Sequence, residues 1–307
     1  MKKVIATALA VCALSAAAPC AAHAQGLELG GQIVGIQIST EGVLVAGTGA
    51  VETAEGSASP AEEAGVRRGD VIVELDGKKV SSAGELIGAV EALQGESAEL
   101  TVLRGGRPLL LTVKPARSDE DQWMLGMWLR DGISGIGTLT FYDPATGLYG
   151  ALGHSISDAD SGAVLPMDEG SITEAEIVSV KPGAAGVPGE LNGCADLGRV
   201  LGSIEHNTEH GIYGHMNRPA GGRPVETGEI RTGPATILAT VDGTNTREFS
   251  VRVSRIYRDS DGEHVMLSVT DPELCSRTGG IVQGMSGSPI LQDGKLVGAV
   301  THVSVST

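Results

Sequence analysis

Glycine is the feature that most constrains the fold of this chain. Its 307 residues include 45 glycines and 13 prolines, whereas aromatic residues make up only 3%. Many of the segments between the glycines are rich in valine and isoleucine, a pattern that favours short strands joined by tight turns over long helices. Hydrophobic residues make up 41% of the chain, enough for a core of aliphatic side chains. We therefore expect a mainly β protein, and the length fits two domains after removal of a leader.

Residues 1–24 have the three parts of an export signal. Lys2 and Lys3 are positively charged, residues 4–18 are apolar, and Ala22-His23-Ala24 fits a cleavage site. The apolar run is short for a membrane-spanning helix, and the alternative to cleavage is an uncleaved anchor. We expect export across the cytoplasmic membrane, with the protein extracytoplasmic and either released by cleavage or held at the membrane by its leader.

Charge and metal-ligand patterns exclude several classes of function. The net charge of −16 argues against binding to nucleic acid or to anionic membranes. After the leader, two cysteines follow, and an exported protein allows either a disulfide between them or two thiols. The spacing of three histidines does not fix one face of a helix, and no Cys-x-x-Cys is present, so we expect neither a metal nor a cofactor. These residues are Cys194, Cys275, His206, His210 and His215.

Residues 31–115 form one module of strands and two short helices. Pro60 suits the first turn of a helix and Gly65 its end. Asp76-Gly77 is typical of a two-residue hairpin, and Ser82 suits the cap of a second helix. The run SPAEEAGVRRGDVIVELDGKKV, residues 59–80, resembles a PDZ domain of the bacterial protease type.

A PDZ domain binds an extended peptide as an added strand at a sheet edge. The resemblance puts the loop that holds a chain terminus at Gly35, Ile36, Gln37 and Ile38. We expect residues 31–115 to fold alone and to bind a peptide or the protein's own cleaved terminus there. The alternative is a domain that only packs against its neighbour.

A charged connector, residues 116–130, leads to a glycine-rich all-β segment, residues 131–307. We expect the aromatic side chains of Trp123 and Trp128 to dock the connector onto this second domain. The segment contains alternating apolar stretches without a long helix, which favours a pair of β-barrels. These stretches are residues 135–142, 235–241, 248–253, 264–269 and 296–303.

The hexamer Gly284-Met-Ser-Gly-Ser-Pro289 is the strongest chemical signal. A nucleophilic serine needs an exposed hydroxyl on a tight turn, with backbone N–H groups directed at the developing oxyanion. Glycines beside Ser286 permit such a turn. His154, in Gly153-His-Ser-Ile-Ser-Asp158, carries an imidazole, the side chain that most often acts as a general base. A third group must orient its imidazole, and spacing does not choose among Asp158, Asp160, Asp196, Asp242 and Asp271.

Three longer runs resemble the stage IV sporulation protein B (SpoIVB) peptidase family. They are GHSISD, LGRVLGSIEHNTEHGIYG and DPELCSRTGGIVQGMSGSPILQDGKLVGAVTHV. The resemblance implies an N-terminal PDZ domain followed by a chymotrypsin-like double β-barrel. It implies a triad of His154, Asp271 and Ser286, with oxyanion N–H groups from Gly284 and Ser286. Family members are expected to run somewhat beyond Thr307 to complete the second barrel.

The resemblance also implies a biological setting. In that setting the peptidase makes a limited cut in a membrane-bound regulator, in the intermembrane space of a sporulating cell. A general quality-control protease and a catalytically inactive PDZ adaptor are the alternatives. In each case the partner is a protein or peptide.

Overall fold

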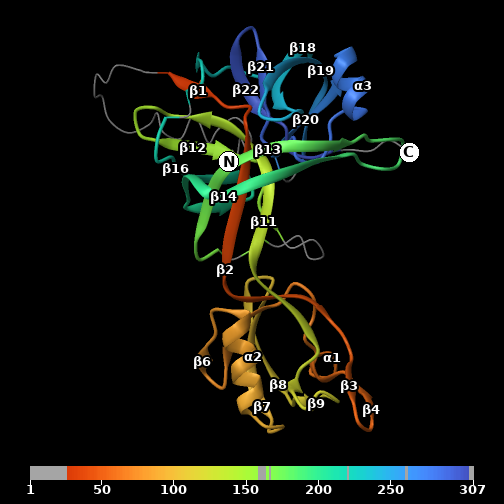
Figure 1. Ribbon diagram of the computed structural model, residues 1–307. Helices are drawn as coiled ribbons and strands as arrows, with labels where there is room; N and C mark the ends of the chain where they lie inside the picture. Colours follow the sequence, from red (N-terminus) through yellow and green to blue (C-terminus); the bar gives the residue numbers. More distant parts are fainter. Residues whose placement is uncertain (1–25, 158–163, 166, 220, 260–261, 304–307) are drawn as a thin grey trace. The chain divides into compact units, whose positions relative to one another are not determined.

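The computed structural model describes residues 26–303 except 158–163, 166, 220 and 260–261, so the predicted leader lies outside it. Strands dominate the ribbon, and the mainly β class is confirmed (Figure 1). The chain divides into two compact units. The first contains residues 1–36, 135–155 and 171–307, and the second contains residues 37–134 and 156–170. No helix among the described residues is long and apolar enough to span a membrane.

The second unit is built on an antiparallel sheet in the order β2-β5-β7-β8. Helix α2 begins where the Ser82 side chain accepts a hydrogen bond from the N–H of Glu85, as predicted, and it buries Leu86 and Val90. Pro60 opens α1, also as predicted. The elements are β2 (Ile33–Thr48), β3 (Val51–Thr53), β4 (Gly56–Ala58), α1 (Pro60–Glu63), β5 (Val71–Leu75), β6 (Lys78–Lys79), α2 (Ala83–Ala92), β7 (Ala98–Arg104), β8 (Arg107–Val113), β9 (Ala116–Arg117), β10 (Trp123–Met124) and the start of β11 (Met127–Tyr142).

Residues 116–130, expected to be a connector, form β9, β10 and the start of β11 within this unit. The side chain of Leu125 is buried in its core, and its carbonyl accepts a hydrogen bond from the N–H of Ala61 at 2.9 Å. The ring of Trp123 covers Gly95, and the backbone N–H of Trp123 donates to the Glu91 carboxylate at 2.7 Å. Apolar side chains in the segment thus find partners within the second unit, where the Trp123 ring packs on Gly95.

The first unit contains two sheets. One has the order β15-β16-β12-β11-β2, and the other has the order β20-β19-β18-β21-β22 and curls around its own core (Figure 1). That core includes Ile237, Phe249, Leu274 and Met285, each nearly inaccessible. The remaining elements are β1 (Leu27–Leu29), β12 (Leu148–Ala151), β13 (Gly170–Lys181), β14 (Glu190–Ile204), β15 (His206–Thr208), β16 (Gly211–His215), β17 (Pro224–Val225), β18 (Gly233–Thr240), β19 (Thr246–Asp259), β20 (Gly262–Val269), α3 (Pro272–Thr278), β21 (Pro289–Gln292) and β22 (Lys295–Ala299).

Candidate active site

The Ser286 turn lies immediately before β21 in the first unit. Met285 is fully buried in the core and anchors the turn, whereas Ser286 is half-buried. Gly284 and Gly287 have φ angles of +95° and +93°, which favour glycine. A Cβ atom at Gly287 would also lie only 2.1 Å from the carbonyl oxygen of Thr138. The glycines around the serine are therefore required by the conformation and by close packing.

The hydrogen bonds of this turn leave two N–H groups for a ligand. Gly287 N–H donates to Val300 O at 2.7 Å, and Ser288 N–H donates to Met285 O at 3.0 Å. In the part of the chain that the structure describes, the N–H groups of Gly284 and Ser286 donate to no backbone carbonyl. These are the two groups that the sequence suggested for an oxyanion hole, and both are available for that role.

His154 follows β12 on a strained turn. Leu152, a buried non-glycine residue, has a φ of +68°, and Gly153 has a φ of +71°. The Nδ1 atom of His154 lies 2.8 Å from the carbonyl oxygen of Ser155. Because a carbonyl oxygen only accepts, neutral His154 carries its proton on Nδ1 and leaves Nε2 as the acceptor. This is the tautomer that a general base for a serine requires.

The two turns converge on residues 300–302. The hydroxyl of Ser286 donates to Thr301 O at 2.9 Å. A Cβ at Gly153 would lie 3.0 Å from the Thr301 side chain and 3.2 Å from Val300 O, so the turn that carries His154 packs on the same segment. The His302 ring lies 5.3 Å from the His154 ring, centroid to centroid. Burial, followed by the nearby imidazoles of His154 and His264, lowers the pKa of His302.

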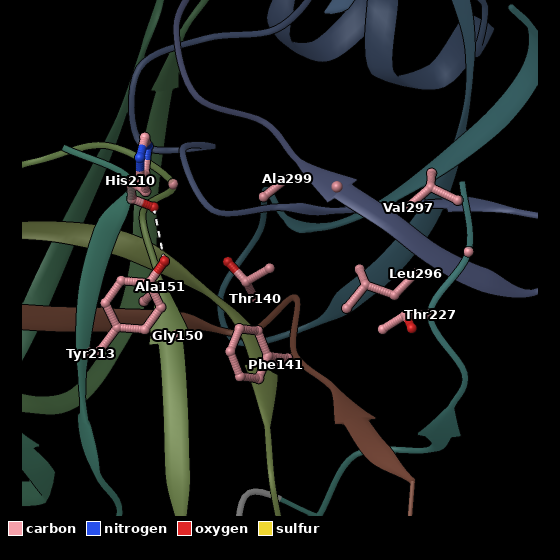
Figure 2. A pocket seen from close by; sticks show the side chains of 13 residues that line it. Thr140, Phe141, Gly150, Ala151, His210, Tyr213, Thr227, Leu296, Val297 and Ala299 are labelled. Carbon is pink, nitrogen blue, oxygen red and sulfur yellow. Dashed lines mark hydrogen bonds between the residues drawn. The ribbon is translucent and has the colours of Figure 1, made fainter. Parts of the chain in front are cut away.

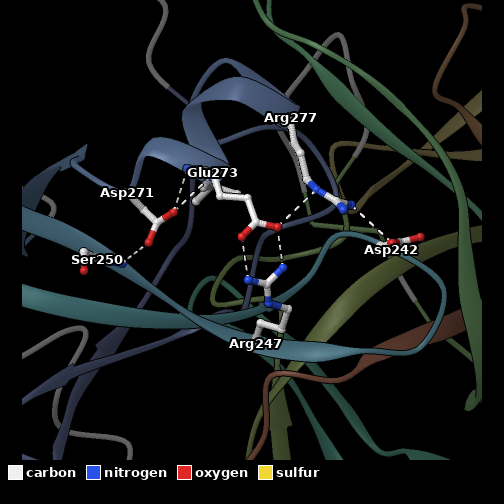
Figure 3. Close-up of polar contacts among 7 residues, drawn as sticks. Asp242, Arg247, Ser250, Asp271, Glu273 and Arg277 are labelled. Carbon is white, nitrogen blue, oxygen red and sulfur yellow. Dashed lines mark hydrogen bonds and ion pairs between the residues drawn. The ribbon is translucent and has the colours of Figure 1, made fainter.

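Asp271 does not join this arrangement. Its carboxylate caps α3 and accepts hydrogen bonds from the N–H groups of Glu273 at 3.0 Å, Leu274 at 3.1 Å and Ser250 at 3.3 Å (Figure 3). Both carboxylate oxygens are thus engaged by backbone N–H groups. The expectation that Asp271 orients His154 is not supported by these contacts.

Of the other candidate aspartates, Asp196 and Asp242 have partners of their own. Asp196 accepts a hydrogen bond from Gly198 N–H, and Asp242 pairs with Arg277 at 3.2 Å (Figure 3). Asp158 and Asp160 lie outside the described residues. Among the described residues, the His154 ring bonds to the Ser155 carbonyl and not to an aspartate.

The expected PDZ loop at residues 35–38 is instead the interior of strand β2. Ile36 and Ile38 are buried, and a Cβ at Gly35 would lie 2.5 Å from the Cβ of Ala195 in the first unit. In the second unit, the N–H and C=O of Ser39 bond to residues 168–169, and Ile38 O lies against Gly132. Gly35, Ile36, Gln37 and Ile38 thus do not form an open edge, because neighbouring strands and loops cover the β2 backbone here.

A small pocket of about 60 Å³ lies beside the His154 turn (Figure 2). Its wall is mostly apolar, and the Tyr213 hydroxyl at one side donates to His210 O at 3.2 Å. Burial raises the pKa of Tyr213. The volume suffices for a few water molecules. Its lining includes Thr140, Phe141, Gly153, Leu296, Val297 and Ala299.

The remaining candidates from the sequence have other surroundings. His215 pairs with Glu205 at 2.8 Å, which lowers the pKa of that carboxyl. No cluster of three or more histidine, cysteine or acidic side chains suited to a metal occurs within the described residues. Cys194 and Cys275 are both exposed and free.

Comparison with known proteins identifies the family. A family model described as SpoIVB peptidase S55 matches residues 121–307, more than half of the chain. The chain belongs to this family. A PDZ domain model matches residues 53–104, so this SpoIVB peptidase S55 family member has a PDZ region before its peptidase region.

Individual relatives match shorter stretches of the chain. HhoA of Synechocystis sp. strain PCC 6803, named as a serine protease, is 48% identical over 60 residues, or 19% of this chain and 15% of HhoA. HhoB of the same organism, also named as a serine protease, is 37% identical over 90 residues, or 28% of this chain and 22% of HhoB. The structure of the PDZ domain of the SdrC-like protein of Listeria monocytogenes is 22% identical, with a TM-score of 0.25; the match covers 31% of this chain and 93% of that domain. The chain spans less than a quarter of HhoA and of HhoB. Together with the family match, their names support a serine peptidase.

Proposed function

We propose that this chain is a serine endopeptidase in which Ser286 is the nucleophile and His154 is the general base. The observation that carries the proposal is the convergence of both turns on residues 300–302. The conformation of each turn adds to it, because Gly284 and Gly287 have positive φ angles and the Nδ1 of His154 is held by a carbonyl.

Catalysis begins when the Ser286 hydroxyl leaves Thr301 O and turns toward Nε2 of His154. The oxygen then attacks the scissile carbonyl while Nε2 takes its proton. The resulting oxyanion is stabilised by the N–H groups of Gly284 and Ser286. His154 gives the proton to the leaving amine as the peptide C–N bond breaks, which leaves the acyl group on Ser286. Water then attacks this acyl group while His154 takes a proton from the water, and the Ser286 oxygen leaves and regains that proton.

The finer proposal is limited, regulatory cleavage of a membrane-associated protein, in sporulation signalling and outside the cytoplasmic membrane. The family match and the PDZ region support a protein substrate that the PDZ region binds and the peptidase cuts at a limited number of sites. The export-type start of the sequence supports the location. A general quality-control protease and an inactive PDZ adaptor are the alternatives that the experiment below and substrate profiling would separate.

The first prediction is that a fluorophosphonate probe labels the purified protein at Ser286. In the reaction the Ser286 oxygen bonds to phosphorus, fluoride leaves, and His154 takes the proton. Ser286→Ala is expected to abolish labelling while changing the thermal midpoint little, because Ser286 is only half-buried. Intact mass and peptide mapping measure the site of attachment.

Ser288→Ala is the matched control. It removes a hydroxyl two residues away that is fully buried and, within the described chain, has no hydrogen-bond partner. Labelling is expected to persist in this variant. Equal labelling of Ser286→Ala and the wild type would exclude Ser286 as the nucleophile, and an unlabelled wild type would favour the adaptor.

A further inference from the structure

Two threonine hydroxyls of β11 bond to the glycine carbonyls on either side of the nucleophile. Thr140 Oγ1 donates to Gly287 O at 2.7 Å, and Thr138 Oγ1 donates to Gly284 O at 3.3 Å. Thr138 and Thr140 are two positions apart in one strand, so their side chains lie on the same face. Both are buried, with exposed fractions of 2% and 8%.

The backbone of Thr138 joins the same two turns. Its N–H donates to Ser286 O at 3.0 Å, and its carbonyl accepts the N–H of Leu152 at 3.2 Å. Leu152 lies two residues before His154 on the strained turn. One strand residue therefore bonds to the turn of the nucleophile and to the turn of the base.

These contacts fix which groups of the nucleophile turn face inward. The carbonyls of Gly284, Ser286 and Gly287 are all occupied by β11, whereas the N–H groups of Gly284 and Ser286 are not used by the described backbone. A buried carbonyl that loses its donor would have to rotate to find another partner. Rotation of the Gly287 peptide would displace Ser286 next to it.

We propose that Thr138 and Thr140 are positioning residues that hold the Ser286 turn in register with the His154 turn. This inference rests on the proposed function of Ser286 and His154. Thr140 contributes more to this positioning than Thr138, because the hydrogen bond of Thr140 to Gly287 O is shorter and buried. Within the described residues, no other side-chain hydroxyl donates a hydrogen bond to the carbonyl of Gly287.

The test compares Thr140→Val with Thr140→Ser. Valine keeps the shape and removes the hydroxyl, and a misplaced nucleophile can cost on the order of 100-fold in rate. We expect Thr140→Val to lower the maximal rate of fluorophosphonate labelling about 10- to 100-fold, with the half-saturating probe concentration within about threefold of the wild type. Thr140→Ser, which restores a donor, is expected to recover most of the rate.

Thr240→Val is the matched control for lost stability. The Thr240 hydroxyl is also buried and donates to a glycine carbonyl, Gly31 O, at 3.0 Å. Its other partner among the described residues is the Thr246 hydroxyl at 2.9 Å, so it makes no hydrogen bond to the Ser286 turn. Comparable thermal midpoints and a slow rate only in Thr140→Val would support positioning. Equal labelling rates in the two variants would overturn the inference.

Hydrogen exchange of the peptide covering residues 282–290 separates this inference from the proposed function. Faster exchange in Thr140→Val than in Thr240→Val supports the positioning role, whether or not the wild type is labelled. A wild type that is never labelled counts only against Ser286 as the nucleophile. Unchanged exchange in all variants counts against positioning. If Thr140→Val fails to fold, Thr138→Val tests the longer bond by the same measurements, with a smaller expected loss.

Discussion

At the scale of single residues, the Asp271 carboxylate stabilises the fold by capping α3. Its pKa is lowered first by the hydrogen bond from Leu274 N–H, then by those from Ser250 and Glu273, and by the charge of Arg247. A carboxyl whose pKa is lower in the folded state stabilises the fold above its unfolded pKa of about 3.9. That contribution is lost as the pH falls through the folded-state value.

We therefore predict that Asp271→Ala lowers the free energy of unfolding by about 1 kcal/mol at pH 7, the usual effect of losing an N-cap. Asp271→Asn should lose less, because asparagine also caps helices. Urea unfolding measures both, and the difference between Asp271→Ala and the wild type should shrink as the pH falls below about 4. Fluorophosphonate labelling should stay within a few-fold of the wild type. A folded Asp271→Asn protein that is no longer labelled would restore Asp271 as the group that orients His154.

The sequence was sufficient to propose Ser286 and His154, but not their partners. The nucleophile is visible because glycines flank it, and the base because it follows a strand and a glycine. Their partners are the carbonyls of Thr301 and Ser155, and a backbone carbonyl is present at every residue, so it leaves no sign in a sequence. Thr138 and Thr140 had a faint signal, since they are alternate polar positions in the otherwise apolar end of β11, residues 136–142.

At the scale of elements, the segment after His154 belongs to the other unit. Residues 156–170 fall in the second unit, where Leu165 packs with Leu44 and Val71. Ser39 exchanges backbone hydrogen bonds with residues 168–169 at 2.9 and 3.0 Å. Local patterns predicted strands and helices such as α2 well, because caps and apolar spacing are local. They did not predict this packing, because its partners are more than 90 residues away.

Leu165→Ala should destabilise the second unit by about 2–5 kcal/mol, the usual cost of emptying a buried leucine site. Both tryptophans of the chain, Trp123 and Trp128, lie in this unit, so their fluorescence during urea unfolding follows it specifically. Ile87→Ala is the control, because that side chain is 60% exposed in the same unit. Similar unfolding midpoints for the two variants would show that residues 156–170 do not contribute to this core.

At the scale of the whole molecule, the two units are not consecutive in the sequence. Strands β2 and β11 each begin in one unit and end in the other, because the unit boundaries fall at residues 36–37 and 134–135. The PDZ region was recognisable because residues 59–80 combine a helix start, a helix stop and a hairpin turn. The sequence did not show that the core of the second unit extends to Leu125, because Leu125 is one apolar residue in a charged and aromatic stretch.

This organisation predicts that residues 116–134 stabilise a fragment of the second unit. A fragment of residues 31–115 lacks Leu125, whose side chain fills the core and whose carbonyl accepts the Ala61 N–H at 2.9 Å. A fragment of residues 31–134 retains both contacts and should unfold at a higher urea concentration, with a free energy of unfolding larger by at least about 2 kcal/mol. Circular dichroism follows both fragments, and Leu125→Ala in the longer one should remove most of its advantage. Identical midpoints for the two fragments would mean that residues 116–134 are a connector after all.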